Sequence, residues 1–415
     1  MGDPLVTVGA ALLGLAMLGA VAILFAWLLR RSEIPGGALA AGLTGGLIAG
    51  ALLGPGVLGR AAPELHESMF LGGVAERAEL ERAELEIEGA AAALESTGVS
   101  EAALREHLEA GENELAALRD DLTWARDDRR GIFNAAALLA FSIILITAPW
   151  RSAGRPRADD EPAQGPILSG LCSLLVAGVP AALLSVWTLG LDRPQALAFG
   201  AAIGIGAMCP GLRARVVGSP GRRRGVDRSA ITAFVGGALV ISALTLSNIL
   251  TAMFALPLLA LLIAMRAPAS RTVKRVLKGM SSSVMAPVLT ALACIHFDPV
   301  AGASTWPFWI AILIAVVFSS DGRWLGGWLG WWSGGTELAR GEAWRRSAAS
   351  LNAGVGAVQI GAALALAGAG LLNDRLLMAV AVGAITVELT AGVRIHFARM
   401  FDRGEPFAPP SPPDA

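Results

Sequence analysis

Three ionisable residues lie in otherwise apolar stretches, and these are the residues that could carry chemistry. Asp321 and Arg323 lie within VVFSSDGRWLGGWLGWW (316–332), and Glu388 lies within AVAVGAITVELTAGV. A carboxylate can hold a proton or a hard cation, and an ionisable group inside a membrane is expensive to keep. We therefore predict that Asp321, Arg323 and Glu388 belong to an ion and proton pathway.

The spacing of Asp321 and Arg323 indicates whether these two charges can form an ion pair with each other. Residues two apart on a helix point to nearly opposite faces, so Asp321 and Arg323 should not pair directly. We hypothesise that Arg323 pairs with Glu388, and that Asp321 either caps a broken helix or serves as a replacement titrating group. An inert ion pair that holds two parts of the protein together is the alternative.

The composition is that of a membrane protein that crosses the bilayer many times. Apolar residues make up 54% of the chain and charged residues 16%, a balance not expected of a soluble domain of this length. The three cysteines and four histidines show no metal-ligand spacing. The sequence gives no sign of an enzyme active site, a cofactor, a metal site or a nucleic-acid partner.

Apolar runs long enough to cross a bilayer predict eleven membrane helices. Arginine and lysine residues follow every second run, which indicates an N-terminus outside and a C-terminus in the cytoplasm of a cell (inner) membrane. The expected spans are 5–29, 36–58, 131–149, 166–190, 194–216, 229–246, 249–266, 279–297, 306–334, 347–371 and 374–396.

The span 306–334 is expected to be one tilted helix, although charges interrupt it. If 306–320 and 324–334 were separate spans, Arg340, Arg345 and Arg346 would face outside and every later loop would be inverted. One helix of about 29 residues is ~43 Å long, which a tilted span accommodates.

The polar segment 63–130 predicts an extramembrane helical hairpin. It contains 18 of the 34 acidic residues, and leucines repeat with heptad spacing on either side of STGVS (96–100). It is either a spacer that steadies the neighbouring helices or a surface for a partner or for dimerisation. The expected organisation is N-terminal membrane helices (1–62), the acidic hairpin (63–130), a transporter-like core (131–400) and a disordered Pro-rich tail (401–415).

Without the first helix, the remaining ten form two halves of opposite orientation, a 5+5 inverted repeat that is common in secondary transporters. The fourth helix of each half contains residues that weaken helices, which predicts two interrupted crossing helices; close packing of small residues is the alternative. The residues singled out are Gly206, Cys209 and Pro210 in the first crossing helix, and Asn352, Gly356 and Gln359 in the second.

Four stretches, in this order, resemble the monovalent cation:proton antiporter superfamily of the sodium/hydrogen exchanger type. They are IPGGALAAGLTGGLIAGALLGPGVLG (34–59), QALAFGAAIGIGAMCPGLRARVV (195–217), GRWLGGWLGWWSGG (322–335) and WRRSAASLNAGVGAVQIGAALALAGAGLLND (344–374). The resemblance implies a core of crossing helices that moves against a dimerisation domain. It also implies exchange of a monovalent cation for protons.

The chain departs from that family in the helix after the first crossing helix. The family has one or two aspartates there, whereas this chain has Val235, Gly236 and Gly237. We therefore keep two hypotheses, a secondary transporter with a relocated site and a non-transporting scaffold or receptor that binds a partner through the hairpin. A homodimer is open under both, and a passive channel lacks a polar lining.

Overall fold

The computed structural model describes residues 4–35, 37–96, 101–151, 165–217, 271–333, 347 and 355–403. Every regular element in these ranges is a helix, which confirms the all-α class. The expected spans 229–246 and 249–266 lie outside them. Among the described residues, five helices are long and apolar enough to cross a membrane, which indicates a membrane protein: Val8–Arg31, Gly37–Ala61, Leu168–Leu189, Arg275–Cys294 and Trp306–Gly330.

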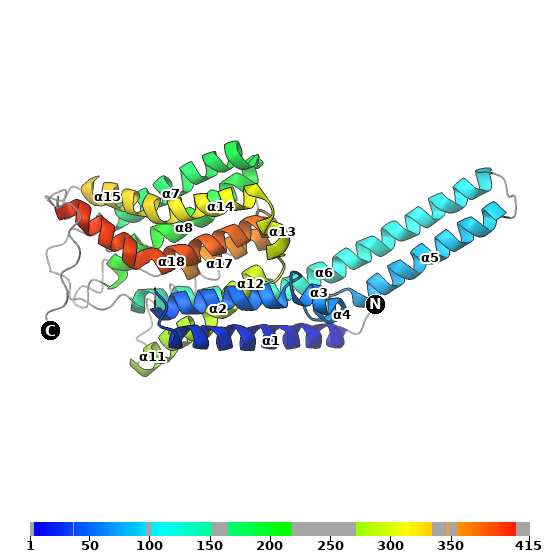
Figure 1. Cartoon of the computed structure of the whole chain (residues 1–415), viewed down its shortest axis with the longest axis horizontal. Coiled ribbons are helices and arrows are strands. Elements are labelled where there is room, and N and C mark those ends of the chain that lie inside the picture. Colours follow the sequence, from blue (N-terminus) through cyan, green and yellow to red (C-terminus); the bar gives the residue numbers. More distant parts are fainter. Residues whose placement is uncertain are drawn as a thin grey trace.

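The helices of the bundle form two groups that lie against each other (Figure 1). One long helix, α6 (Glu101–Arg151), contacts both groups. The first group consists of α1 (Pro4–Arg31), α2 (Gly37–Leu53), α11 (Arg271–Met280) and α12 (Ala286–Cys294). The second group consists of α7 (Gly165–Leu189), α8 (Arg193–Val217), α14 (Trp306–Val317), α15 (Arg323–Ser333), α17 (Gly356–Gly368) and α18 (Asp374–Arg403).

Glycines at every fourth position bring helices within each group into backbone contact. A Cβ added at Gly50 of α2 would lie 2.6 Å from the Cys294 Cβ of α12, and one at Gly326 of α15 would lie 2.6 Å from the Ser173 Cα of α7. Lipid provides little hydrophobic drive between apolar helices, so close packing of small residues stabilises these pairs. The glycines are Gly42, Gly46 and Gly50 on α2, Gly322 just before α15, and Gly326 and Gly330 on α15.

The prediction of one helix across 306–334 is confirmed. The helix runs from Trp306 to Ser333 through α14, a π-helical turn η3 (Phe318–Gly322) and α15, without a break. A second π-helical turn, η2 (Ser281–Met285), joins α11 to α12 in the same way. Such turns leave backbone groups available to outside partners, and the Arg30 Nη2 of α1 donates to the Ser282 carbonyl of η2 at 2.6 Å.

The hairpin consists of α5 (Val74–Ser96) and the first half of α6, which pack side by side and project from one end of the bundle (Figure 1). We call this end the hairpin end. Gly111 accommodates the side chain of Ile87, since a Cβ there would lie 2.9 Å from Ile87 Cγ2. The 51 residues of α6 extend ~77 Å without a break. The boundary expected after residue 130 therefore falls inside one rigid helix.

The first crossing helix was predicted to be interrupted, and this prediction is wrong over Arg193–Val217. Residues Arg193–Val217, which include Gly206, Cys209 and Pro210, form one α-helix. The glycines instead allow close approach, because a Cβ at Gly204 would lie 2.9 Å from the Leu174 carbonyl oxygen of α7. Small-residue packing, the alternative, accounts for this helix.

Candidate functional site

The second crossing helix begins inside the protein. Val355 precedes it and is only 3% exposed, and α17 starts at Gly356. The 13 residues of α17 extend ~20 Å, which is short of the ~30 Å hydrocarbon core. A helix that begins in the interior presents backbone N–H groups there, and these need acceptors.

Glu388 provides one of those acceptors. Its Oε1 accepts a hydrogen bond from the Gly356 backbone N–H at 2.7 Å, and the residue is 5% exposed. The positive end of a helix dipole favours a carboxylate at this position. Gly356 is required for this approach, because a Cβ would lie 3.0 Å from both Glu388 Cγ and Leu43 Cδ1 of α2. The carboxylate therefore lies where the two helix groups meet.

Gln359 lies one turn along α17 from Gly356 and contacts both η3 and α8. Its Nε2 donates to the Ser319 Oγ of η3 at 2.6 Å, and both residues are buried. Its Cβ would lie 2.9 Å from a Cβ added at Gly206 of α8. The sequence predicted Gly206, Gly356 and Gln359, and the structure brings them together with Glu388. Ser319 was missed, although SSDG already marked a polar break in an apolar helix.

Asp321 and Arg323 separate as the helical spacing predicts. Arg323 is 1% exposed, and its backbone carbonyl accepts from the Ser173 Oγ of α7 at 3.0 Å. Asp321 lies on the exposed side of the helix and accepts from the Ser320 Oγ at 3.1 Å. The exposed position of Asp321 does not support its placement in the interior pathway, because it lies on the side of the helix away from the buried Arg323.

The relative depth of Arg323 and Glu388 follows from neighbouring helices. α14 and α18 lie together and run in the same direction (Figure 1), and a Cβ at Gly383 would lie 2.6 Å from Ala315 Cβ. Glu388 lies five residues beyond Gly383 on α18, and Ser320 lies five residues beyond Ala315 on the facing helix, so the two are at about the same level. Arg323 lies three residues, or ~4.5 Å, further from the hairpin end. The pairing of Arg323 with Glu388 stays a prediction.

The remaining predicted residues of the crossing helices are Cys209, Pro210 and Asn352. Cys209 and Pro210 belong to α8, beyond Gly206. Asn352 lies outside the described residues.

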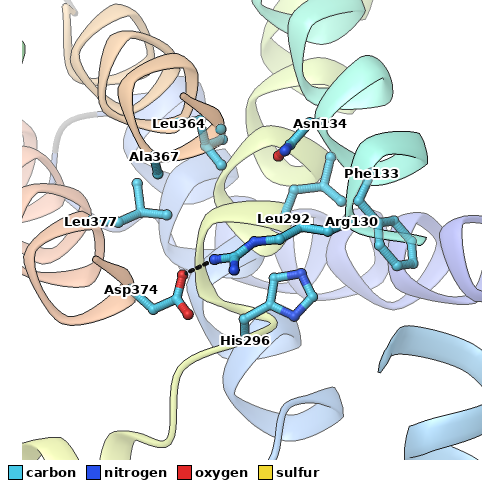
Figure 2. Close-up of a pocket in the computed structure, with 10 residues that line it drawn as sticks. Arg130, Phe133, Asn134, Leu292, His296, Leu364, Ala367, Asp374 and Leu377 are labelled. Atoms are coloured by element: carbon cyan, nitrogen blue, oxygen red, sulfur yellow. Dashed lines mark hydrogen bonds and ion pairs between the residues drawn. The ribbon is translucent and has the colours of Figure 1, made fainter. Parts of the chain in front are cut away.

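A pocket at the hairpin end lies between α6, the end of α12 and the start of α18 (Figure 2). The Arg130 Nη2 of α6 is 2.6 Å from the Asp374 Oδ1 of α18, and His296 lies beside this ion pair. Asp374 begins α18. Its partner lies 244 residues away in the chain, so sequence spacing gave no signal for the contact.

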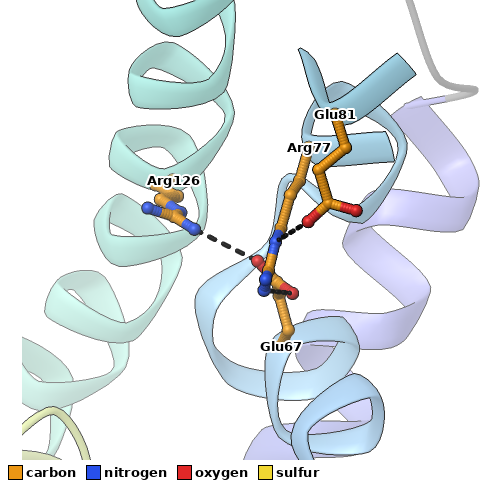
Figure 3. Close-up of polar contacts among 4 residues, drawn as sticks. All are labelled: Glu67, Arg77, Glu81 and Arg126. Atoms are coloured by element: carbon orange, nitrogen blue, oxygen red, sulfur yellow. Dashed lines mark hydrogen bonds and ion pairs between the residues drawn. The ribbon is translucent and has the colours of Figure 1, made fainter. Parts of the chain in front are cut away.

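A second cluster of charges lies at the base of the hairpin (Figure 3). Glu67 begins the π-helical turn η1 (Glu67–Leu71), and its carboxylate accepts from Arg77 at 2.8 Å and from Arg126 at 3.1 Å. The hydrogen bonds from Arg77 to Glu67 and Glu81 raise the pKa of that guanidinium. Burial lowers the pKa of the neighbouring His66, and the charge of Glu67 partly opposes this. This cluster joins η1, α5 and α6.

Within the part of the chain that the structure describes, no group of three or more His, Cys, Asp or Glu side chains could hold a metal ion. No family model, curated protein or solved structure matches the chain. The antiporter resemblance is therefore carried by the residues alone, and function must be argued from the site.

Proposed function

We propose that this protein is an integral membrane secondary transporter that exchanges a monovalent cation for protons, with Glu388 as the group that alternates between them. The observation that carries the proposal is the buried Glu388 carboxylate, hydrogen bonded to the Gly356 amide where α17 begins. Ionisable residues within membrane segments mark ion and proton pathways by default. Helix ends at the midplane are the usual ion sites of secondary transporters.

The surroundings of Glu388 fit a cation that has lost its water. Carboxylate, hydroxyl and amide oxygens suit a hard monovalent cation, and Ser319 and Gln359 supply the last two near the first turn of α17. A proton and a cation would compete for the same carboxylate, which couples the two fluxes in opposite directions. Glu388 would thus replace the aspartates that the resemblance leads one to expect near Gly236.

The two helix groups supply the parts for alternating access. Transport of this kind needs one body to rock against another around a fixed site. The site here lies between α17 and α18 of the second group and Leu43 of the first. We propose that the eleven helices form the 5+5 inverted repeat, with α17 as its interrupted crossing helix.

We also propose the orientation that the loop charges predict, with the C-terminus in the cytoplasm. The last turn of α1 contains Arg30 and Arg31, α11 begins at Arg271, and α18 ends at Arg403. These three helix ends lie opposite the hairpin end (Figure 1). An excess of arginine on one side marks the cytoplasmic face, so the hairpin would lie outside.

Reconstitution into proteoliposomes tests this function. An outward gradient of Na⁺ or K⁺ should drive proton uptake, which a pH-sensitive dye inside the vesicles reports. Glu388→Gln should reduce the signal to that of protein-free vesicles, since a neutral amide cannot exchange a proton for a cation. Asp321→Asn, which changes an exposed acid on a neighbouring helix, is the matched control and should retain flux. Normal flux in Glu388→Gln would refute the assignment.

The second candidate function is a non-transporting scaffold whose hairpin binds a protein partner. Trp124 of α6 is 77% exposed and Leu85 of α5 is 70% exposed, and apolar side chains exposed in water favour an interaction surface. Absence of flux with both Na⁺ and K⁺ would favour this candidate over exchange.

A further inference from the structure

One face of α6 makes two contacts with the second helix group. Arg130 pairs with Asp374 at the start of α18. Eleven residues further along, the Phe141 ring lies directly against Gly361 of α17, where a Cβ would overlap it. Eleven residues are three helical turns and ~16 Å, so both side chains point from the same face of α6.

Between these two contacts the seam of α6 and α17 contains two small hollows, and the second has no room for a water molecule in this closed form. The pocket beside Arg130 is continued by a second hollow, and Asn134 and Leu364 line both. Figure 2 shows Asn134 and Leu364 from facing helices at the edge of the pocket. The second hollow reaches Gly361, where Phe141 is seated and only 1% exposed. Gly356 lies five residues, ~7.5 Å, beyond Gly361 along α17.

We propose that the route from the hairpin end to Glu388 runs along this seam, and that Arg130 and Phe141 are its two gates. The proposal rests on the proposed function, since it supplies an access path to the same carboxylate. The outer gate is the Arg130–Asp374 ion pair, and the inner gate is the Phe141 ring on Gly361. The structure shows both gates closed.

The two gates differ in how they resist opening. Arg130 and Asp374 are 42% and 34% exposed, and a half-exposed ion pair is weak, so it opens and closes readily. Phe141 is buried among apolar side chains and excludes water from the site below it. Opening the inner gate requires α6 and α17 to separate, as a relative movement of the two helix groups would make them do.

Cysteine labelling tests the gates without relying on transport. In a background without Cys172, Cys209 and Cys294, Leu364→Cys reports on the hollow above Phe141, and Glu388→Cys reports on the site below it. A membrane-impermeant methanethiosulfonate is added from the hairpin side. Trp124→Cys, at an exposed position of the hairpin, shows that the reagent reaches that side.

Arg130→Ala should accelerate labelling of Leu364→Cys severalfold, and Phe141→Ala should accelerate labelling of Glu388→Cys severalfold. Phe141→Leu should give an intermediate rate if alanine at that position prevents folding. Arg119→Ala, which breaks an ion pair within the hairpin, and Leu139→Ala, at an exposed position of α6, are matched controls and should change neither rate. The charge swap Arg130→Asp with Asp374→Arg should restore slow labelling.

Unchanged rates in both gate variants would overturn the proposal, even if the wild-type protein exchanges cations for protons. Accelerated labelling in both, in a protein that shows no flux, would support the gated route while refuting the exchange function. Equal acceleration by Arg119→Ala or Leu139→Ala would also overturn it, because the effect would then be general loosening of α6.

Discussion

Two buried glutamates, Glu67 and Glu388, are held in different ways. Glu67 lies at the base of the hairpin with two guanidinium groups against its carboxylate (Figure 3). Glu388 lies between the helix groups and accepts from a backbone amide at the start of α17. Glu67 thus joins η1, α5 and α6 at the hairpin base, whereas Glu388 joins α18 to the start of α17. We infer that the first carboxylate is structural and that the second is the exchanging group of the proposed function.

The same contrast extends to how the surrounding helices are joined. At the hairpin base, arginines on α5 and α6 reach one acid on η1, and these arginines are 42–49% exposed. Within the second helix group, α15 meets α7 through glycines, with backbone against backbone. Long charged side chains bridge helices in contact with water, while small residues do so in lipid.

The largest expected effect separates the two acids by function. Glu388→Gln should abolish cation-driven proton flux, whereas Glu67→Gln should leave flux near the wild-type level, because its carboxylate joins helices at the base of the hairpin. Both are measured in the proteoliposome assay at equal protein content. Loss of flux in both variants would show that the two acids do not differ in the way we infer.

The next effect concerns the packing of glycines in the core. Gly326→Ala should destabilise the protein by ~1–3 kcal/mol, because the new Cβ would lie 2.6 Å from backbone atoms of Cys172 and Ser173. Thermal unfolding in detergent measures the change. Gly89→Ala on α5, where nothing lies within 4 Å of the added Cβ, is the control and should not destabilise the protein. Equal destabilisation by both would mean that close packing is not the cause.

A smaller effect is expected at the hairpin base. Glu67→Gln should destabilise the hairpin by ~1–2 kcal/mol, less than for a fully buried ion pair because both arginine partners are half exposed. Amide hydrogen exchange in α5 measures this locally. Glu81→Gln, which removes a 59% exposed partner of Arg77, should have little effect and serves as the control.

The smallest effect is a pH dependence at the same base. Burial lowers the pKa of His66 in the folded protein, so the unfolded chain binds a proton first as the pH falls. Folding stability should therefore decrease as the pH drops below about 6.5, the ordinary value for histidine, down to the folded-state pKa. His66→Gln should flatten this part of the curve. A wild-type stability that is constant between neutral and mildly acidic pH would contradict the prediction.

Some elements followed directly from sequence patterns. The charge rule indicated one helix across 306–334, and the structure has one from Trp306 to Ser333. Helical spacing indicated that Asp321 and Arg323 face apart, and one is exposed while the other is buried. Both are local properties, set by the length and period of a helix and by the cost of placing charge in lipid.

Other elements depended on contacts between distant segments. Pro210 and the glycines of α8 predicted a broken helix, yet the helix continues because its glycines pack against α7 and α17. The hairpin 63–130 and the span 131–149 were expected as separate elements, and the structure joins them in one helix, α6. A glycine can mark a break in a helix or a place where two helices pack closely. Which of the two applies depends on the helix that lies against it.

The sequence by itself determined that this is an all-helical membrane protein and which few charges its apolar stretches contain, because hydropathy and helical period are properties of short segments. Only the tertiary structure decided which of these charges are buried and what they contact. It turned Asp321 outward, placed Glu388 against the first amide of α17, and set Phe141 over Gly361. Each of these depends on which helices lie side by side, and that is fixed by packing between residues far apart in the chain.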